Sequence, residues 1–210
     1  VAIDEDLRLL LTSWFNPGFL TLEKIDWDTE ASILEKIIQY ETVHTIVDWK
    51  DLKNRLTINR RCFAYFHPAL DDEPLIFVEI ALTVGISSTI QSIINDDSEV
   101  EQQADTAIFY SINNCQRGLK KVPLGNFLIK MVVTELAMEL PSIKKYSTLS
   151  PIPGFADWLK KEITSGDSKY ITNDDREIYK LLEDELWHQD QKKSKKLKKP
   201  LIKACAHYLL

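Results

Sequence analysis

Glycine, cysteine and long apolar runs are scarce in this 210-residue chain, and each shortage excludes a class of protein. With only six glycines and no G-x-G-x-x-G or Walker A pattern, the chain lacks the glycine-rich turns on which Rossmann and P-loop proteins seat phosphates. The longest apolar run, from Pro74 to Val84, is interrupted by Glu79 and is too short to cross a bilayer. No signal-peptide pattern opens the chain, so we expect no membrane partner.

The cysteine pattern and the charge balance indicate the cellular compartment and exclude some partners. Cys62, Cys115 and Cys205 are an odd number at wide spacing without a C-x-x-C pair, which predicts reduced thiols in the cytoplasm or, in a eukaryote, an organelle matrix. The 26 Lys and Arg against 32 Asp and Glu leave a formal charge of −6, which argues against nucleic acid as a partner. The one basic run, Lys192 to Lys199, is interpreted as a solvated loop between helices, with attraction to a phosphate or an acidic surface as the alternative.

The length predicts one globular domain, with or without a small appendage, that can bury a core without disulfides or metal. The chain begins with Val1 rather than Met and stops in the apolar pattern Ala206 to Leu210. We therefore expect a chain that is excised or clipped at both ends.

Hydrophobic spacing divides the chain near residue 57. Residues 1–57 are predicted to be helical, and the order of the elements after them is β-β-β-α-β-α, which indicates the α+β class. The predicted helices of the first part lie at 4–14, after a cap at Asp28 or Thr29, and at 48–56. The predicted strands lie at 61–67, 74–83, 106–113 and 146–149, and the predicted later helices at 125–140, 158–163, 173–187 and 199–210. In the helix at 125–140, Phe127, Leu128, Met131, Val132, Leu136 and Leu140 are expected to face the core.

The passage from Tyr110 to Phe127 combines a strand, a basic turn and the start of a helix. The N-terminus of a helix presents unpaired N–H groups and partial positive charge, so it can seat a pyrophosphate. Lys120 and Lys121 would add charge there, and Gly125 would let the backbone approach a phosphate closely. The alternative is a plain strand-to-helix turn with solvated lysines.

A second candidate is Ser150, which follows a predicted strand and precedes Pro151, Pro153 and Gly154. Prolines restrict the backbone, and a restricted backbone can hold a hydroxyl in the single orientation that catalysis needs. No G-x-S-x-G elbow is present, which disfavours a serine hydrolase. The alternative is a turn serine that caps the helix near Trp158.

Three further residues carry expectations of their own. Glu79 within an apolar strand predicts a buried partner or a role in a pocket. His67 and Cys115 are interpreted as structural, although a histidine at a strand end could act as a base and a thiol could bridge subunits.

Four segments together resemble the malonyl-CoA decarboxylase family: WFNPGFLTLEKIDWD, RRCFAYFHPALDDEPLIFVEIALT, YSINNCQRGLKKVPLGNFLIK and TLSPIPGF. The likeness runs in register over nearly the whole chain. It implies that residues 1–57 are the end of a helical N-terminal domain with its linker. It also implies that residues 58–210 are a catalytic domain of the GNAT acetyltransferase fold, a mixed sheet with flanking helices, whose C-terminal part is missing.

In the GNAT fold, the loop before the central helix binds the pyrophosphate of coenzyme A. Its motif Q/R-x-x-G-x-G/A falls here on the run from Lys120 to Gly125, and the adjoining Asn126 adds one more backbone amide. The implied binding residues are Lys120, Lys121, Val122, Pro123, Leu124, Gly125 and Asn126. The chain departs from the motif at Lys120 and Pro123, and Pro123 removes one N–H donor.

The resemblance also implies the catalytic residues. It makes Ser150 catalytic and places Ser111 in the same pocket, while the family's histidine lies in an N-P-V-A-N-F-H-like segment after the region matching 201–210. His44, His67, His188 and His207 are the four histidines of the chain, and none lies in such a segment, so the chain alone is expected to be inactive.

The implied reaction converts malonyl-CoA to acetyl-CoA and CO2 through a thioester enolate. It needs no metal and no cofactor beyond the CoA of the substrate, and we expect a homo-oligomer. Two alternatives stay open: a GNAT-like decarboxylase or acyltransferase for malonyl groups on a carrier protein, and a non-catalytic acyl-CoA-binding module.

Overall fold

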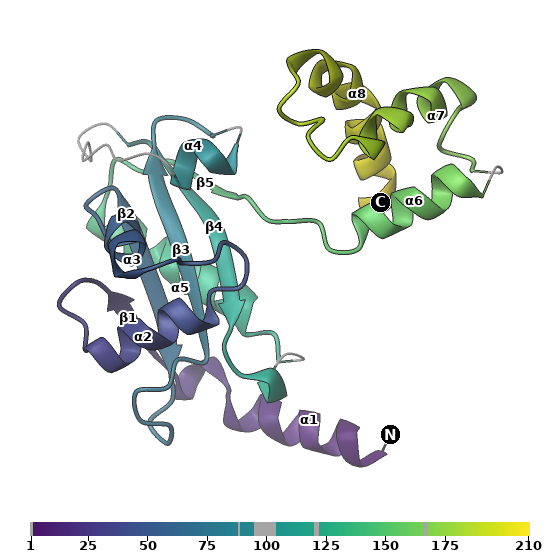
Figure 1. Ribbon diagram of the computed structural model, residues 1–210. Helices are drawn as coiled ribbons and strands as arrows, with labels where there is room; N and C mark the ends of the chain where they lie inside the picture. Colours follow the sequence, from purple (N-terminus) through teal and green to yellow (C-terminus); the bar gives the residue numbers. More distant parts are fainter. Residues whose placement is uncertain (1, 88, 95–103, 120–121, 166–167) are drawn as a thin grey trace. The chain divides into compact units, whose positions relative to one another are not determined.

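The computed structural model describes residues 2–87, 89–94, 104–119, 122–165 and 168–210. The chain divides into two compact units, Val1–Ser150 and Pro151–Leu210 (Figure 1). This boundary differs from the family-based division at residues 57 and 58, because the segment before residue 57 packs onto the sheet that follows it.

The first unit is built on a five-stranded sheet in the order β1-β2-β3-β4-β5. The first four strands are antiparallel, and β5 runs parallel to β4. The strands are β1 (Thr21–Ile25), β2 (Arg60–Phe66), β3 (Ile76–Thr83), β4 (Thr106–Asn114) and β5 (Lys145–Thr148). The expected α+β class, a mixed sheet with flanking helices, is confirmed.

The expectation that residues 1–57 are helical is wrong at β1. Thr21 to Ile25 pairs with Phe66 to Cys62 of β2, and Ile25 is buried in the core. The five residues TLEKI carry too short an apolar pattern to predict a strand, and pairing with β2 decides their conformation.

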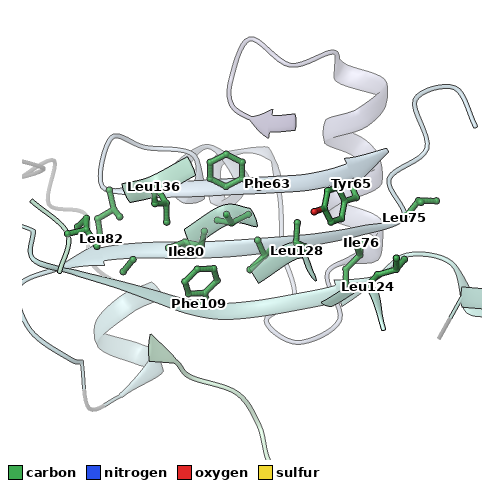
Figure 2. Packing of buried hydrophobic residues seen from close by; sticks show 14 of the residues in the cluster. Phe63, Tyr65, Leu75, Ile76, Ile80, Leu82, Phe109, Leu124, Leu128 and Leu136 are labelled. Carbon is green, nitrogen blue, oxygen red and sulfur yellow. The ribbon is translucent and has the colours of Figure 1, made fainter. Parts of the chain in front are cut away.

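Helix α5 (Leu124–Glu139) covers one face of the sheet. Figure 2 shows the packing of Phe63, Ile80 and Phe109 from the strands with Leu128 and Leu136 from this helix. The buried positions Leu124, Leu128, Val132 and Leu136 recur every four residues. Helix α1 (Ala2–Trp14) and the turn η1 (Pro17–Phe19) precede β1, and Leu11 and Phe15 pack against the same core.

Two of the positions expected to face the core in α5 are instead exposed. Phe127 is 42% and Met131 44% exposed, whereas Leu128 and Val132 are fully buried. Apolar residues occur on more than one side of this helix, so the spacing alone did not single out the buried stripe.

The opposite face is covered by α2 (Ala31–Tyr40) and α3 (Trp49–Arg55). Ile37 and Leu52 pack there with Cys62 and Phe77. The short helix α4 (Ile90–Ile94) places Ile93 in a smaller cluster with Ala81, Ile108 and Tyr110. The turn η3 (Arg117–Leu119) leads from β4 toward α5.

The second unit contains α6 (Phe155–Thr164), α7 (Asn173–Tyr179), η4 (Lys180–Glu183) and α8 (Gln191–Leu209). Its core is formed by Leu159, Ile171, Tyr179, Leu197 and Ala204.

The basic run does not form the expected loop, because Lys192 to Lys199 lies within α8. The side chain of Asp190 caps this helix, and the buried side chain of Leu197 packs into the core of the second unit. These contacts stabilise a helix in a segment whose charge pattern is also typical of a solvated loop. Within the described residues, no helix is long and apolar enough to span a membrane.

Candidate active site

A bulge in β4 redirects two consecutive side chains. Glu79 of β3 pairs with Ser111 and Ile80 pairs with Phe109, so Tyr110 has no partner on β3. Tyr110 packs into the cluster with Ile93, and Ser111 reaches the face that α2 covers. Such bulges are common beside active sites because they redirect side chains.

Strands β4 and β5 separate at Phe109, next to the bulge. Their parallel pairing ends with Phe109 opposite Thr148, and the Leu149 N–H donates to the Phe109 carbonyl at 2.9 Å. β4 continues to Asn114, and beyond Phe109 no described strand pairs with this side. An extended ligand could hydrogen-bond this free edge.

Ser150 leaves the sheet at this separation point. It follows Leu149, whose side chain packs against the cluster that contains Tyr110, and Ser150 itself is exposed. The N-cap of α6 is Gly154, without a side-chain capping bond, so the structure does not support the alternative that Ser150 caps that helix.

The N-terminus of α5 follows the end of β4. Pro123 is its N-cap and has no side-chain capping bond, while the Leu124 N–H donates to the Val122 carbonyl at 2.8 Å. Val122 and Leu124 are buried in the core, whereas Asn126 is exposed. The first N–H groups of a helix have no partner within it, so this turn can still receive an anion. Lys120 and Lys121 lie outside the described residues.

The side of Gly125 from which a Cβ would project faces the sheet. A Cβ added there would lie 3.6 Å from Ile76 Cδ1 and 3.9 Å from Ile112 Cγ2, which are ordinary contacts. An alanine would therefore fit against the sheet at this position, and the role of Gly125 beside a phosphate stays a prediction.

Ser111 belongs to a buried polar cluster. The side chain donates from Oγ to Glu41 Oε2 at 2.7 Å and accepts from Asn113 Nδ2 at 2.8 Å, and the residue is 2% exposed. Glu41 Oε2 also accepts from Asn113 Nδ2, and Glu41 Oε1 accepts from the backbone N–H groups of Val43 and His44, each at 2.7 Å. Sequence reasoning missed Glu41 and Asn113, since nothing in their local pattern distinguishes them from surface residues.

Glu79 has the buried partner that its sequence context predicted. It lies opposite Ser111, is 1% exposed, and accepts a hydrogen bond from Arg55 Nη1 at 3.1 Å. Burial, together with the hydrogen-bonded carboxyl of Glu41, raises its pKa from 4.5 to about 8. Arg55 is also paired with Asp51 at 3.1 Å.

The remaining candidates have structural contacts. His67 Nδ1 accepts from the Ala69 N–H at 3.1 Å and its ring contacts Phe15, while Cys115 is buried, which raises the pKa of its thiol. In the part of the chain that the structure describes, no group of three or more His, Cys, Asp or Glu residues could hold a metal ion.

Comparison with known proteins settles the family. The family model "Malonyl-CoA decarboxylase C-terminal domain" matches residues 18–210. The chain belongs to the malonyl-CoA decarboxylase family. The match includes the bulge of β4, the start of α5 and Ser150.

Relatives in this family are similar over almost the whole chain. The mitochondrial malonyl-CoA decarboxylase of Anser anser anser is 41% identical over 97% of the chain and 45% of its own length. The crystal structure of malonyl-CoA decarboxylase from Rhodopseudomonas palustris is 48% identical with a TM-score of 0.87, covering 95% of this chain and 49% of that one. The structure from Agrobacterium vitis is 48% identical with a TM-score of 0.86, covering 94% and 49%. The chain thus spans about half the length of the relatives it matches.

Proposed function

We propose that the protein containing this chain is a malonyl-CoA decarboxylase that converts malonyl-CoA to acetyl-CoA and CO2. The observation that carries the proposal is the 48% identity to solved malonyl-CoA decarboxylases over 94–95% of the chain. The family match at residues 18–210 includes each element that the sequence assigns to the site.

The proposed binding mode uses the free backbone groups beside the sheet. The backbone N–H groups of Gly125 and Asn126 in the first turn of α5 receive the pyrophosphate of coenzyme A, since the N–H of Leu124 already donates to Val122. The edge of β4 beyond Phe109 pairs with the amide groups of the pantetheine arm. This mode would bring the thioester toward Ser150, which leaves the sheet where β4 and β5 separate.

The proposed chemistry assigns a polar role to Ser150. Loss of CO2 leaves a thioester enolate, and a hydrogen-bond donor already aimed at the malonyl group lowers the barrier as charge develops. The enolate carbon then takes a proton from a positioned acid. By family resemblance this acid is a histidine in a segment beyond the region that matches this chain. Ser111, whose hydroxyl proton is engaged by Glu41, would keep an oxygen lone pair for a further donor.

The test is the Ser150→Ala variant of the full-length protein. We expect CO2 release from malonyl-CoA to be abolished, because the donor is lost, while the dissociation constant for acetyl-CoA measured by calorimetry stays near that of the wild type. Retained turnover would contradict the assignment. Wild-type turnover only of malonyl groups on a carrier protein would favour the carrier-dependent alternative, and CoA binding without any turnover would favour a binding module.

The same proposal covers the reaction's other requirements. No metal or organic cofactor takes part apart from the CoA of the substrate, so prolonged dialysis against a chelator should leave turnover unchanged.

The protein acts as a homo-oligomer in the cytoplasm or an organelle matrix. The name of the Anser anser anser relative places that enzyme in mitochondria. Light scattering of the purified protein would test the oligomer.

A further inference from the structure

Glu41 connects the end of α2 to the bulged part of β4. It is the C-cap residue of α2 and is 3% exposed. One carboxylate oxygen accepts two backbone N–H groups, and the other accepts the Ser111 hydroxyl and the Asn113 amide, each at 2.7 Å. Thr42 extends the connection, since its N–H and hydroxyl donate to Asn113 Oδ1 at 3.0 and 2.9 Å.

The carboxyl of Glu79 completes the cluster from β3. Glu41 and Glu79 hydrogen-bond each other, and two carboxyl groups can do so only if one of them holds a proton. Four hydrogen-bond donors already occupy the oxygens of Glu41, whereas burial raises the pKa of Glu79, so the proton resides on Glu79. Arg55 Nη1 donates to Glu79 Oε2 at 3.1 Å.

This arrangement matters because β4 lacks a described strand partner on one side beyond Phe109. Past that residue, Ser111 and Asn113 of β4 donate hydrogen bonds to Glu41, and Asn113 also accepts one from Thr42. Displacement of Ser111 or Asn113 would therefore shift the free edge of the strand where we place the substrate.

We propose that Glu41 is a positioning residue of the active site: by sharing the proton of Glu79, its carboxylate holds Ser111 and Asn113 and sets the shape of the bulged strand. The proposal rests on the proposed decarboxylase function. Glu41 acts through β4 and is not itself expected to touch the substrate.

The pH dependence of this pair also depends on charged and titratable groups that pack near it in the described part of the chain. Ionisation of Glu79 would place a second carboxylate beside Glu41, and only Arg55 donates to it from the facing helix. The groups whose charges act on the pair or on its neighbours are Asp51 and Arg55 from α3, Cys62 and Arg60 from β2, Tyr110 from β4, Cys115 after β4, and His44, whose ring contacts Tyr110.

Three variants of the full-length protein test the proposal: Glu41→Gln, Glu79→Gln and, as a matched control, Glu23→Gln on the exposed side of β1. For Glu41→Gln we expect kcat for malonyl-CoA to fall roughly 10- to 100-fold, since misplaced groups cost rates of this order, with KM nearly unchanged. In Glu79→Gln the amide N–H2 can donate to Glu41 as the neutral carboxyl does. This conservative variant should therefore turn over at neutral pH and lack the fall in kcat that we expect of the wild type as pH rises through about 8.

Three outcomes would contradict the proposal. A wild-type kcat and pH profile in Glu41→Gln would overturn the positioning role. An alkaline fall in Glu79→Gln identical to that of the wild type would overturn the shared proton. Loss of kcat in parallel with loss of melting temperature and acetyl-CoA affinity would assign Glu41 a structural role only, which also overturns the proposal.

A titration that needs no turnover separates this proposal from the proposed function. With 13C-labelled glutamate carboxyls, the wild type should give one resonance that titrates near pH 8 and is missing from Glu79→Gln. If the wild-type protein does not decarboxylate malonyl-CoA, the proposed function fails and the catalytic role of Glu41 fails with it. The titration still decides whether the pair shares a proton, and its absence would overturn that part.

Discussion

At the scale of single residues, the buried carboxyl of Glu79 has a measurable effect on stability. Its pKa is raised in the folded chain by burial and by the charge of Glu41, so the folded state holds a proton that the unfolded state releases above about pH 4.5. The free energy of unfolding should therefore fall as pH rises from about 4.5 to about 8, and this contribution should level off above that range. In Glu79→Gln this part of the pH dependence should be missing, which urea titrations of both proteins at a series of pH values would measure. Parallel curves for the two proteins would contradict the assignment.

Two glycines make a matched pair with opposite expectations. Gly154 has a φ of 74°, and an added Cβ would lie 2.9 Å from the Tyr208 hydroxyl, so Gly154→Ala should destabilise the second unit by about 1–2 kcal/mol. Gly125 lies in a helix with room for a Cβ against Ile76, so Gly125→Ala should leave stability unchanged or raise it by up to about 1 kcal/mol. Denaturant unfolding of both variants would check this. A larger loss at Gly125 than at Gly154 would refute the packing argument.

Single positions also show where sequence reasoning stopped. An acidic residue inside the apolar strand at 74–83 predicted a partner, and Arg55 and Glu41 fill that role. Their identity was not predictable, because Glu41 and Arg55 lie 38 and 24 positions away in the sequence numbering (79 − 41 and 79 − 55) and meet Glu79 only through the packing of α2 and α3 on the sheet.

At the scale of elements, α8 illustrates how a cap offsets crowded charge. Asp190 accepts from the N–H groups of Lys192 and Lys193 at 2.8 and 3.2 Å, and its charge opposes that of the lysines in the first turn. We expect Asp190→Ala to lower the free energy of unfolding of the second unit by about 1 kcal/mol. Asp190→Asn keeps the hydrogen bonds but loses the charge, so its effect should be smaller and should vanish at high salt. Thermal or urea melts would measure both, and an equal loss in the two variants would show that the charge dominates.

The same helix and the first strand explain the errors in element prediction. The spacing of apolar residues located α2 and α5 close to their observed bounds, because both helices bury several apolar side chains, although it did not single out the buried side of α5. β1 and the N-terminal half of α8 lack such a stripe. Pairing with β2 makes the first a strand, whereas the Asp190 cap and the burial of Leu197 and Pro200 make the second a helix.

At the scale of the whole molecule, the sheet brings together segments that are far apart in the sequence. The β4-α5-β5 crossover aligns β4 and β5 in parallel, and their separation after Phe109 leaves a free edge next to the Ser150 loop. The roles predicted for Ser150 and for the first turn of α5 remain predictions, for which the variants above provide the tests. Lys120 and Lys121 lie outside the described residues, so their predicted contact with phosphate rests on sequence alone.

Local periodicity and short motifs were enough to predict the class of fold, the family and several candidate residues, because these patterns do not depend on what packs against them. The strand at 21–25, the orientation of Ser111 and the pairing of the Glu41 and Glu79 carboxyls became evident only in the folded chain. Strand pairing, bulges and buried hydrogen bonds depend on contacts between residues distant in the chain, and no local pattern specifies those contacts.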